Sequence, residues 1–282
     1  MIIDMHTHIF PEKISSAVVE KLSRTSHTPA FTDGTIHGLQ RSMDAAQIDL
    51  SVILPVATNT SQVEKINSSA AALNEQFAGK GALSFGCMHP DFTNYRAELD
   101  RVKNYGLKGI KLHPVYQATD LDDIKFLHII DRAAELDLIV VTHAGLDIGF
   151  PGEVRCSPQM AKNVVDTIGN FKFVLAHMGG WKNWDDVLKI LGGTKIFIDT
   201  SFSTGKIIPR SDFAWRTEDL KLLTPAQFMQ FVEIFSADRI LFGTDSPWTS
   251  AQDSLDFIKN LPLNDTDRKK ILGLNAKHLL NI

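Results

Sequence analysis

The chain has 282 residues, with 29 lysines and arginines against 33 aspartates and glutamates, so its formal net charge is −4. Hydrophobic residues make up 44% of the sequence, which is typical of a globular protein with a large core. The mild net acidity disfavours a nucleic-acid partner, because phosphate binding needs a basic face. Apolar runs such as Leu138–Val141 are far too short to cross a bilayer, which disfavours a membrane protein.

The start of the chain and the cysteines predict where the protein works. Ile2 and Ile3 already have the character of a strand, with no basic segment of a secretory signal before them. Cys87 and Cys156 are too few for a disulfide framework, and we interpret both as buried thiols. We therefore expect a cytoplasmic protein with one domain over residues 1–282, a small-molecule partner, and a homodimer as the assembly to test.

Short apolar runs rich in strand-forming residues recur about every 34 residues, a spacing that suits one strand and one crossover helix. The eight runs are Met1–Met5, Leu50–Val56, Ala82–Met88, Leu107–Leu112, Leu138–Thr142, Phe171–Ala176, Lys195–Asp199 and Arg239–Phe242. Because most of these runs are apolar throughout rather than alternating, they favour a parallel sheet that is covered by helices.

The segments between these runs carry helical patterns. Ser61–Phe77 and Asp122–Leu136 place apolar residues at steps of three and four, which predicts amphipathic helices. Thr224 followed by Pro225 is typical of a helix start, ahead of Phe228–Phe235. Eight strand–helix units most simply close as a single (β/α)8 TIM barrel of the α/β class. An open doubly wound sheet would instead need a glycine-rich loop after the first strand.

Histidines gather at the predicted strand ends, where the active site of such a barrel lies. Those at or just after strand ends are His6, His8, His113, His143 and His177, and Asp245 follows the eighth strand. His6 and His8 are two residues apart on a strand, so both side chains point the same way and can share an ion. Imidazoles combined with one carboxylate suit Zn²⁺ or a similar divalent ion, which would activate a water molecule.

Each feature taken alone has a plainer interpretation. His143 fits a buried histidine that is satisfied by a backbone carbonyl, and Asp245 fits the cap of a turn. A lone His-x-His pair is a weak metal signal. The coincidence of all these features at matching strand ends favours a shared metal site.

These motifs resemble the amidohydrolase superfamily over essentially the whole chain. They are Asp4–His8, Lys111 on the fourth strand, His143-Ala144-Gly145, His177–Gly180 and Gly243–Trp248. Within the superfamily, the motifs most resemble the amidohydrolase-related (amidohydrolase 2) branch, which includes the aminocarboxymuconate-semialdehyde decarboxylases. It implies a barrel of the metallo-dependent hydrolase type, with His6, His8 and His143 as metal ligands and Asp245 as a ligand or proton shuttle. It also implies that His177 is a ligand of a second ion or orients the attacking water.

Lys111 bears on the number of metal ions. The segment Gly109–Pro114 resembles the dihydroorotases, in which a carboxylated lysine bridges two ions, whereas the decarboxylase-containing branch usually lacks that lysine and uses one ion. The alternative is that Lys111 binds a substrate carboxylate or pairs with an acidic residue. We favour one ion, most simply Zn²⁺, with His143 completing its site. For His113 we expect no more than loop packing before Pro114.

The long segment Thr200–Leu223 after the seventh strand is a candidate wall of the substrate site. We expect Arg210 or Arg216 to bind a substrate carboxylate, with Trp215 and Trp181 as aromatic walls. The plainer interpretation of each is ordinary packing or solvated surface.

The sequence predicts an enzyme, and two reactions fit it closely. The first is metal-dependent hydrolysis of a C–N bond or an ester or lactone C–O bond in a small carboxylated molecule, with Asp245 and His177 as catalytic residues. The alternative is a metal-dependent non-oxidative decarboxylase on the same scaffold. A nuclease of the TatD-like kind fits less well, because Gly243 and Lys111 stand where those enzymes typically carry glutamate.

Overall fold

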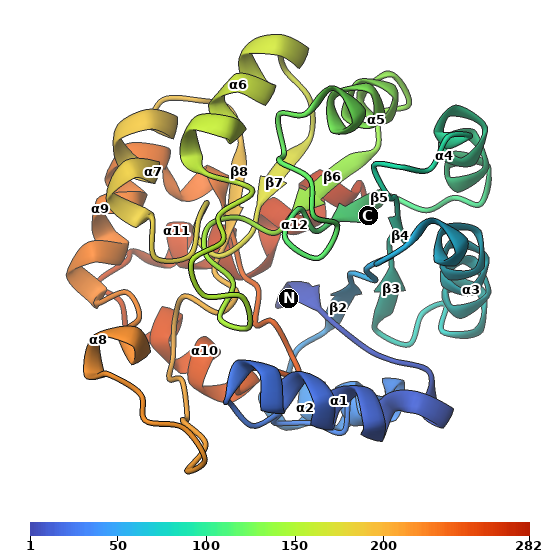
Figure 1. Ribbon diagram of the computed structural model, residues 1–282. Coiled ribbons are helices and arrows are strands. Elements are labelled where there is room, and N and C mark those ends of the chain that lie inside the picture. The colour runs from blue at the N-terminus through green and yellow to red at the C-terminus, as the bar shows by residue number, and fades with distance from the viewer.

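A ring of short parallel strands surrounded by helices forms the centre of the computed structural model, which describes residues 1–282 (Figure 1). Every strand pair is parallel, and the pairs follow chain order in two sheets, β1-β2-β3 and β4 through β9. The strands are β1 (Ile3–Thr7), β2 (Leu50–Ile53), β3 (Ala82–Ser84), β4 (Gly86–Cys87), β5 (Gly109–Leu112), β6 (Ile139–Thr142), β7 (Phe173–Leu175), β8 (Phe197–Asp199) and β9 (Ile240–Leu241).

Backbone hydrogen bonds join the two sheets into one closed ring. β3 and β4 are parts of one strand that is interrupted at Phe85. The Met5 N–H donates to the carbonyl of Phe242 at 2.8 Å, and a parallel bridge pairs Thr7 with Ser246. Eight strand positions therefore close on themselves, and the predicted (β/α)8 TIM barrel is confirmed.

The helices lie outside the ring, and several begin at the predicted signals. Pro225 opens α9, where Thr224 and Gln227 form a reciprocal capping box. Asp123 caps α5, whose apolar face packs inward. The helices are α1 (Glu12–Ser26), α2 (Ile36–Ala46), α3 (Val63–Gln76), α4 (Tyr95–Asn104), α5 (Ile124–Glu135), α6 (Pro158–Ile168), α7 (Trp184–Leu191), α8 (Thr217–Leu220), α9 (Pro225–Phe235), α10 (Ala251–Lys259), α11 (Asp265–Lys269) and α12 (Asn275–Leu280). Short 3-10 turns occupy Thr60–Gln62 and Ala237–Arg239, and Lys270–Leu274 forms a π turn.

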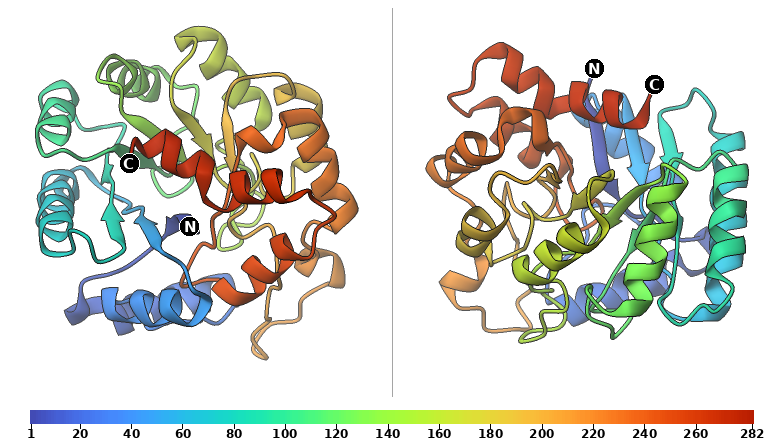
Figure 2. Two further views of the ribbon diagram at one scale, coloured as in Figure 1. Left: turned by 180° about the vertical axis from the view of Figure 1, so that it is seen from behind. Right: turned by 90° about the horizontal axis from the view of Figure 1, so that it is seen from above.

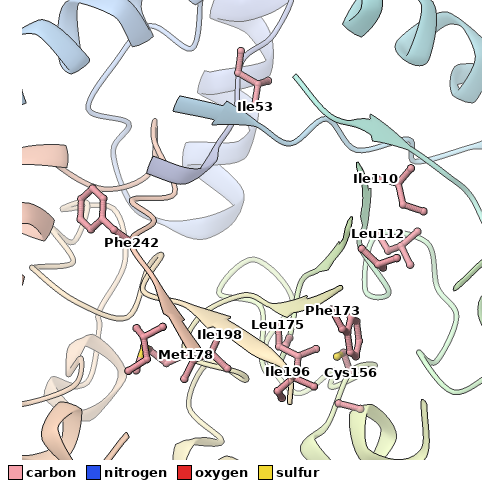
Figure 3. Close-up of a cluster of buried hydrophobic side chains, with 14 of the residues drawn as sticks. Ile53, Ile110, Leu112, Cys156, Phe173, Leu175, Met178, Ile196, Ile198 and Phe242 are labelled. Carbon is pink, nitrogen blue, oxygen red and sulfur yellow. The ribbon is translucent and has the colours of Figure 1, made fainter. Parts of the chain in front are cut away.

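Two layers of buried side chains hold the barrel together. The inner cluster fills the ring with residues such as Met5, Phe85 and Val141, and Leu279 of α12 packs against it. The outer cluster lies between strands and helices, and Figure 3 shows part of it. Seen from behind in Figure 2, the C-terminal helices cross the ring on the face opposite the loops that follow the strands. The core thus closes one end of the barrel and leaves the carboxyl ends of the strands for a site.

All eight predicted strands are present, most of them shorter than the apolar runs that predicted them. The predicted helices at Ser61–Phe77 and Asp122–Leu136 appear as α3 and α5, and each is shorter at both ends. Cys87 and Cys156 are buried free thiols, as predicted. None of the helices has the length and apolar character that crossing a membrane requires.

Candidate metal centre and active site

Three side chains converge where the barrel closes. His6 lies near the end of β1, His8 follows the strand, and Asp245 comes from the loop after β9. The closure seam brings them together, since the Asp245 N–H donates to the carbonyl of His6 at 2.8 Å. Oδ1 of Asp245 lies 3.1 Å from Nε2 of His8 and 3.3 Å from Nε2 of His6. The three donor atoms lie within 4.8 Å of one another, so this set fits a divalent ion that takes nitrogen and oxygen ligands.

Partners behind the two histidines fix their rings. Oδ2 of Asp199, at the end of β8, lies 2.9 Å from Nδ1 of His6, and the carbonyl of Leu54 accepts from Nδ1 of His8 at 2.8 Å. With each Nδ1 proton so engaged, each Nε2 lone pair faces the other donors. Asp199 also accepts hydrogen bonds from Ser201 and from the backbone N–H of His177. Sequence reasoning missed Asp199, although a carboxylate at the end of an apolar strand was a usable signal.

Asp245 and His177 both adopt backbone conformations that are unusual for residues other than glycine. Their φ angles are 68° and 60°, in the left-handed region. Such strain persists where the surroundings hold it, often at functional sites. Both residues follow strand ends, and the unusual turn helps to direct their side chains over the end of the barrel.

His143 and His177 form a second part of the site. Nδ1 of His143 lies 3.0 Å from Nε2 of His177, whose own Nδ1 donates to the carbonyl of Ser201 at 3.0 Å. Oδ2 of Asp147 lies 4.0 Å from Nε2 of His143 and 3.7 Å from Nε2 of His113. His113, His143 and Asp147 form another potential ligand group. Nε2 of His143 is buried without a hydrogen-bond partner.

The expected four-ligand set is therefore divided in this structure. His6, His8 and Asp245 form one group, whereas His143 belongs to the other. His113 is more than a loop-packing residue, because it stacks on His143 with ring centroids 4.4 Å apart. Asp147 lies in the loop after β6, and sequence reasoning missed it.

Lys111 lies at the bottom of the site. Its Nζ is 3.1 Å from Nε2 of His6, and no carboxylate oxygen comes within 4.0 Å, so the alternative of pairing with an acidic residue is not observed. Burial lowers the pKa of Lys111 to about 8. Burial, and next the charge of Lys111, lower the pKa of His6 to about 4. The imidazole of His6 is thus neutral at pH 7, which is the form that binds a metal ion.

Burial also determines the charge of the other groups. It lowers the pKa of His143 and of His113 well below the ordinary histidine value. Burial alone would raise the pKa of Asp245, but its close contact with Nε2 of His8 and the field of the nearby imidazoles outweigh burial and hold this pKa below its ordinary value. The site therefore combines the neutral imidazoles of His6, His113 and His143 with an ionised carboxylate.

These groups open into a cavity of about 1130 Å³, whose lining includes Trp181, Phe202 and Trp248. Trp181 thus lies where an aromatic wall was expected. Three of the expected substrate-binding residues, Arg210, Trp215 and Arg216, are absent from the lining.

Nearby partners account for the position of these three side chains. The Arg210 guanidinium pairs with Asp212 at 3.0 Å, and Arg216 pairs with Asp219 at 2.6 Å. The Trp215 indole N–H donates to the carbonyl of His27 at 3.2 Å. Acidic residues two and three positions along the chain hold the guanidinium groups at the surface, so the structure does not bring them to the expected substrate carboxylate.

A profile of the amidohydrolase family matches residues 3–282. The chain belongs to the amidohydrolase family. No curated protein sequence matches it. This amidohydrolase is thus an enzyme of a metal-dependent family, and the predicted family resemblance is confirmed.

Several solved structures share the fold over nearly the whole chain. The 5-carboxyvanillate decarboxylase LigW from Sphingomonas paucimobilis is 15% identical with a TM-score of 0.69, and the match covers 100% of this chain and 99% of that one. A dihydroxybenzoic acid decarboxylase from Polaromonas, with bound manganese, is 16% identical with a TM-score of 0.69 over 99% and 96% of the two chains. A probable 2-pyrone-4,6-dicarboxylic acid hydrolase from Acinetobacter baumannii is 15% identical with a TM-score of 0.65 over 100% and 99%.

Proposed function

We propose that this amidohydrolase is a metal-dependent hydrolase that cleaves an amide, ester or lactone bond of a small carboxylated molecule. The observation that carries the proposal is the convergence of His6, His8 and Asp245 at the mouth of a large cavity. The carboxylate of Asp245 is ionised, and its Oδ1 faces the imidazoles of His6 and His8. Its Oδ2 accepts no hydrogen bond from the protein. An unengaged carboxylate oxygen beside ligand imidazoles suits a group that accepts a proton during hydrolysis.

We propose a single ion, Zn²⁺, held by His6, His8 and Asp245, with His143 as a fourth ligand. The donor set fits, since neutral imidazoles and one carboxylate are ligands that zinc takes. The manganese in the Polaromonas enzyme makes Mn²⁺ the first alternative metal to test. When bound, such an ion supplies Lewis acidity and makes water a nucleophile at neutral pH.

The protein's own side chains divide the remaining work. Asp245 takes the proton of the attacking water at Oδ2 and passes it to the leaving group. His177 donates through Nδ1 to the carbonyl of Ser201, which leaves the lone pair of Nε2 at the cavity to accept a hydrogen bond from the attacking water and orient it. Trp181 and Phe202, with ring centroids 5.6 Å apart, form an apolar wall that limits the access of water.

Decarboxylation is the second candidate, and Lys111 is the observation that favours it. A buried cation that lines the cavity without a carboxylate partner suits the carboxylate of an acidic substrate. Two of the three similar structures described above are decarboxylases, which agrees with this alternative.

A direct screen separates the two reactions. Metal-free protein is reconstituted with Zn²⁺ or Mn²⁺ and supplied with lactones, N-acyl amino acids and aromatic acids, while proton release and CO₂ release are measured in parallel. We expect hydrolysis without CO₂, and loss of turnover in His177→Gln at unchanged metal content. Stoichiometric CO₂ release without hydrolysis would establish the decarboxylase instead.

A further inference from the structure

An apolar groove leads away from the metal donors between helices α1 and α3. We define this α1–α3 groove by Ile14, Val18 and Leu22 on α1 and by Ile66, Ala70 and Leu73 on α3. Figure 1 shows the two helices on neighbouring sides of the ring. The outer face of β2 contributes Ile53 to the same lining. Because these residues and His6, His8 and Asp245 line one continuous cavity, no wall separates the groove from the reaction site.

Helix α1 is packed unusually for an amphipathic helix. Its buried residues are the small polar Ser15, Ser23 and Ser26. Its apolar stripe, Ile14, Val18 and Leu22, recurs every four residues and faces the groove instead of the core. Ile14 is 49% exposed, and Val18 and Leu22 are only partly buried. The stripe therefore leaves apolar surface in contact with water that a ligand could cover.

The opposite wall has the same character along much of α3. Ile66 and Leu73 are partly buried, and the lining continues to Gln76 and Phe77 at the far end of the helix. A helix of 14 residues spans about 20 Å, so the groove is long enough for an extended chain. The whole cavity, about 1130 Å³, exceeds the range of roughly 300–1,000 Å³ that is usual for small-ligand sites.

We propose that the groove binds an unbranched apolar arm of the substrate, while the reacting polar head lies at His6, His8 and Asp245. The inference rests on the proposed metal-dependent function and names its substrate class, a small molecule with a reactive head and an aliphatic arm. The continuity of the groove with the reaction site favours a substrate arm over a second protein. Two exposed lysines at the rim, Lys21 and Lys65, leave the far end of the arm close to water.

The test uses alkyl hydroxamates, whose head group chelates divalent ions. Dissociation constants of acetohydroxamate, butanohydroxamate, hexanohydroxamate and octanohydroxamate are measured on the full-length protein loaded with Zn²⁺. We expect the dissociation constant to fall about two- to fourfold with each added methylene, because each becomes buried. A flat series with bound acetohydroxamate would overturn the groove assignment alone. Failure of acetohydroxamate to bind would overturn the proposed metal site and, with it, this inference.

Two tryptophan variants on α3 test whether the dependence of binding on chain length arises in the groove. Ser69 is exposed and lines the groove, whereas Ala72 is exposed on the same helix outside the lining. We expect Ser69→Trp to reduce the ratio of the acetohydroxamate and octanohydroxamate dissociation constants at least tenfold, and Ala72→Trp to leave it unchanged. Val18→Trp on the facing helix repeats the test should Ser69→Trp fail to fold. If Ser69→Trp instead dissociates a dimer and chain length has no effect, the groove is an interface between copies and the proposal is wrong.

Discussion

Nε2 of His6 lies 3.1 Å from Nζ of Lys111, and both side chains are buried. Because Asp199 engages Nδ1 of the same ring, Nε2 carries the lone pair and the lysine ammonium donates to it. A divalent ion at His6 has to compete with this ammonium for the same lone pair. Metal binding and the charge of Lys111 are therefore coupled.

This coupling predicts the effect of Lys111→Met on metal affinity. Removing a positive charge beside the donor atoms lowers the repulsion that an incoming cation meets. We expect the affinity for Zn²⁺ at pH 7 to rise at least tenfold with the stoichiometry still one, as measured by titration calorimetry. The exposed Lys21→Met serves as the matched control and should bind like wild type. A stoichiometry that falls from two ions to one, with weaker binding, would show that Lys111 is a carboxylated bridge.

His6 and His8, at the end of β1 and just after it, are expected to be indispensable for the metal and dispensable for the fold. Ligands at the carboxyl ends of barrel strands lie outside the packed core. His6→Ala combined with His8→Ala should abolish Zn²⁺ binding and keep the far-UV circular dichroism spectrum of wild type. Full metal occupancy in this double variant would refute the ligand assignment.

Asp199 is predicted to raise the metal affinity of the site without contacting the ion. It holds Nδ1 of His6 at 2.9 Å, and such partners of ligand histidines typically contribute 10–100-fold to metal affinity. Asp199→Asn should weaken Zn²⁺ binding by about that factor. Asp212→Asn, in the exposed loop, is the matched control. Equal affinities for the two variants in a competition assay with a chromogenic chelator would exclude this role.

The strand pattern and the metal donors could both be predicted from the sequence, for physical reasons. Strands that are buried on both faces give uninterrupted apolar runs, and barrel closure places Asp245 beside His6. Helix α1 was missed although Ile14, Val18 and Leu22 recur at steps of four, and its buried residues are serines rather than apolar side chains. The position of Asp147 depends on the path of the loop after β6, which no periodicity encodes. For Arg210, the nearby Asp212 was an available signal of a surface ion pair.

The buried lysine also predicts how stability changes with pH. Burial lowers the pKa of Lys111 from 10.5 to about 8, so between these values the unfolded chain binds more protons than the folded one. Stability therefore rises with pH across that window, and the full penalty is present below about pH 8. Metal-free Lys111→Met should exceed metal-free wild type in free energy of unfolding at pH 7, by up to about 3 kcal/mol.

Urea unfolding at pH 7 and pH 9.5 checks this prediction. The difference between the variant and wild type should shrink at the higher pH, because wild-type Lys111 is then largely neutral in the folded state. The same difference at both pH values would mean that the lysine is not held in an environment that disfavours its charge.

The most direct test of the metal centre is a crystal structure of the protein grown with Zn²⁺, with anomalous diffraction recorded above and below the zinc edge. The account predicts one strong anomalous peak, within about 2.3 Å of Nε2 of both His6 and His8 and of a carboxylate oxygen of Asp245, beside an unmodified Lys111. Two peaks flanking a carboxylated Lys111, or no peak at His6 and His8, would contradict it.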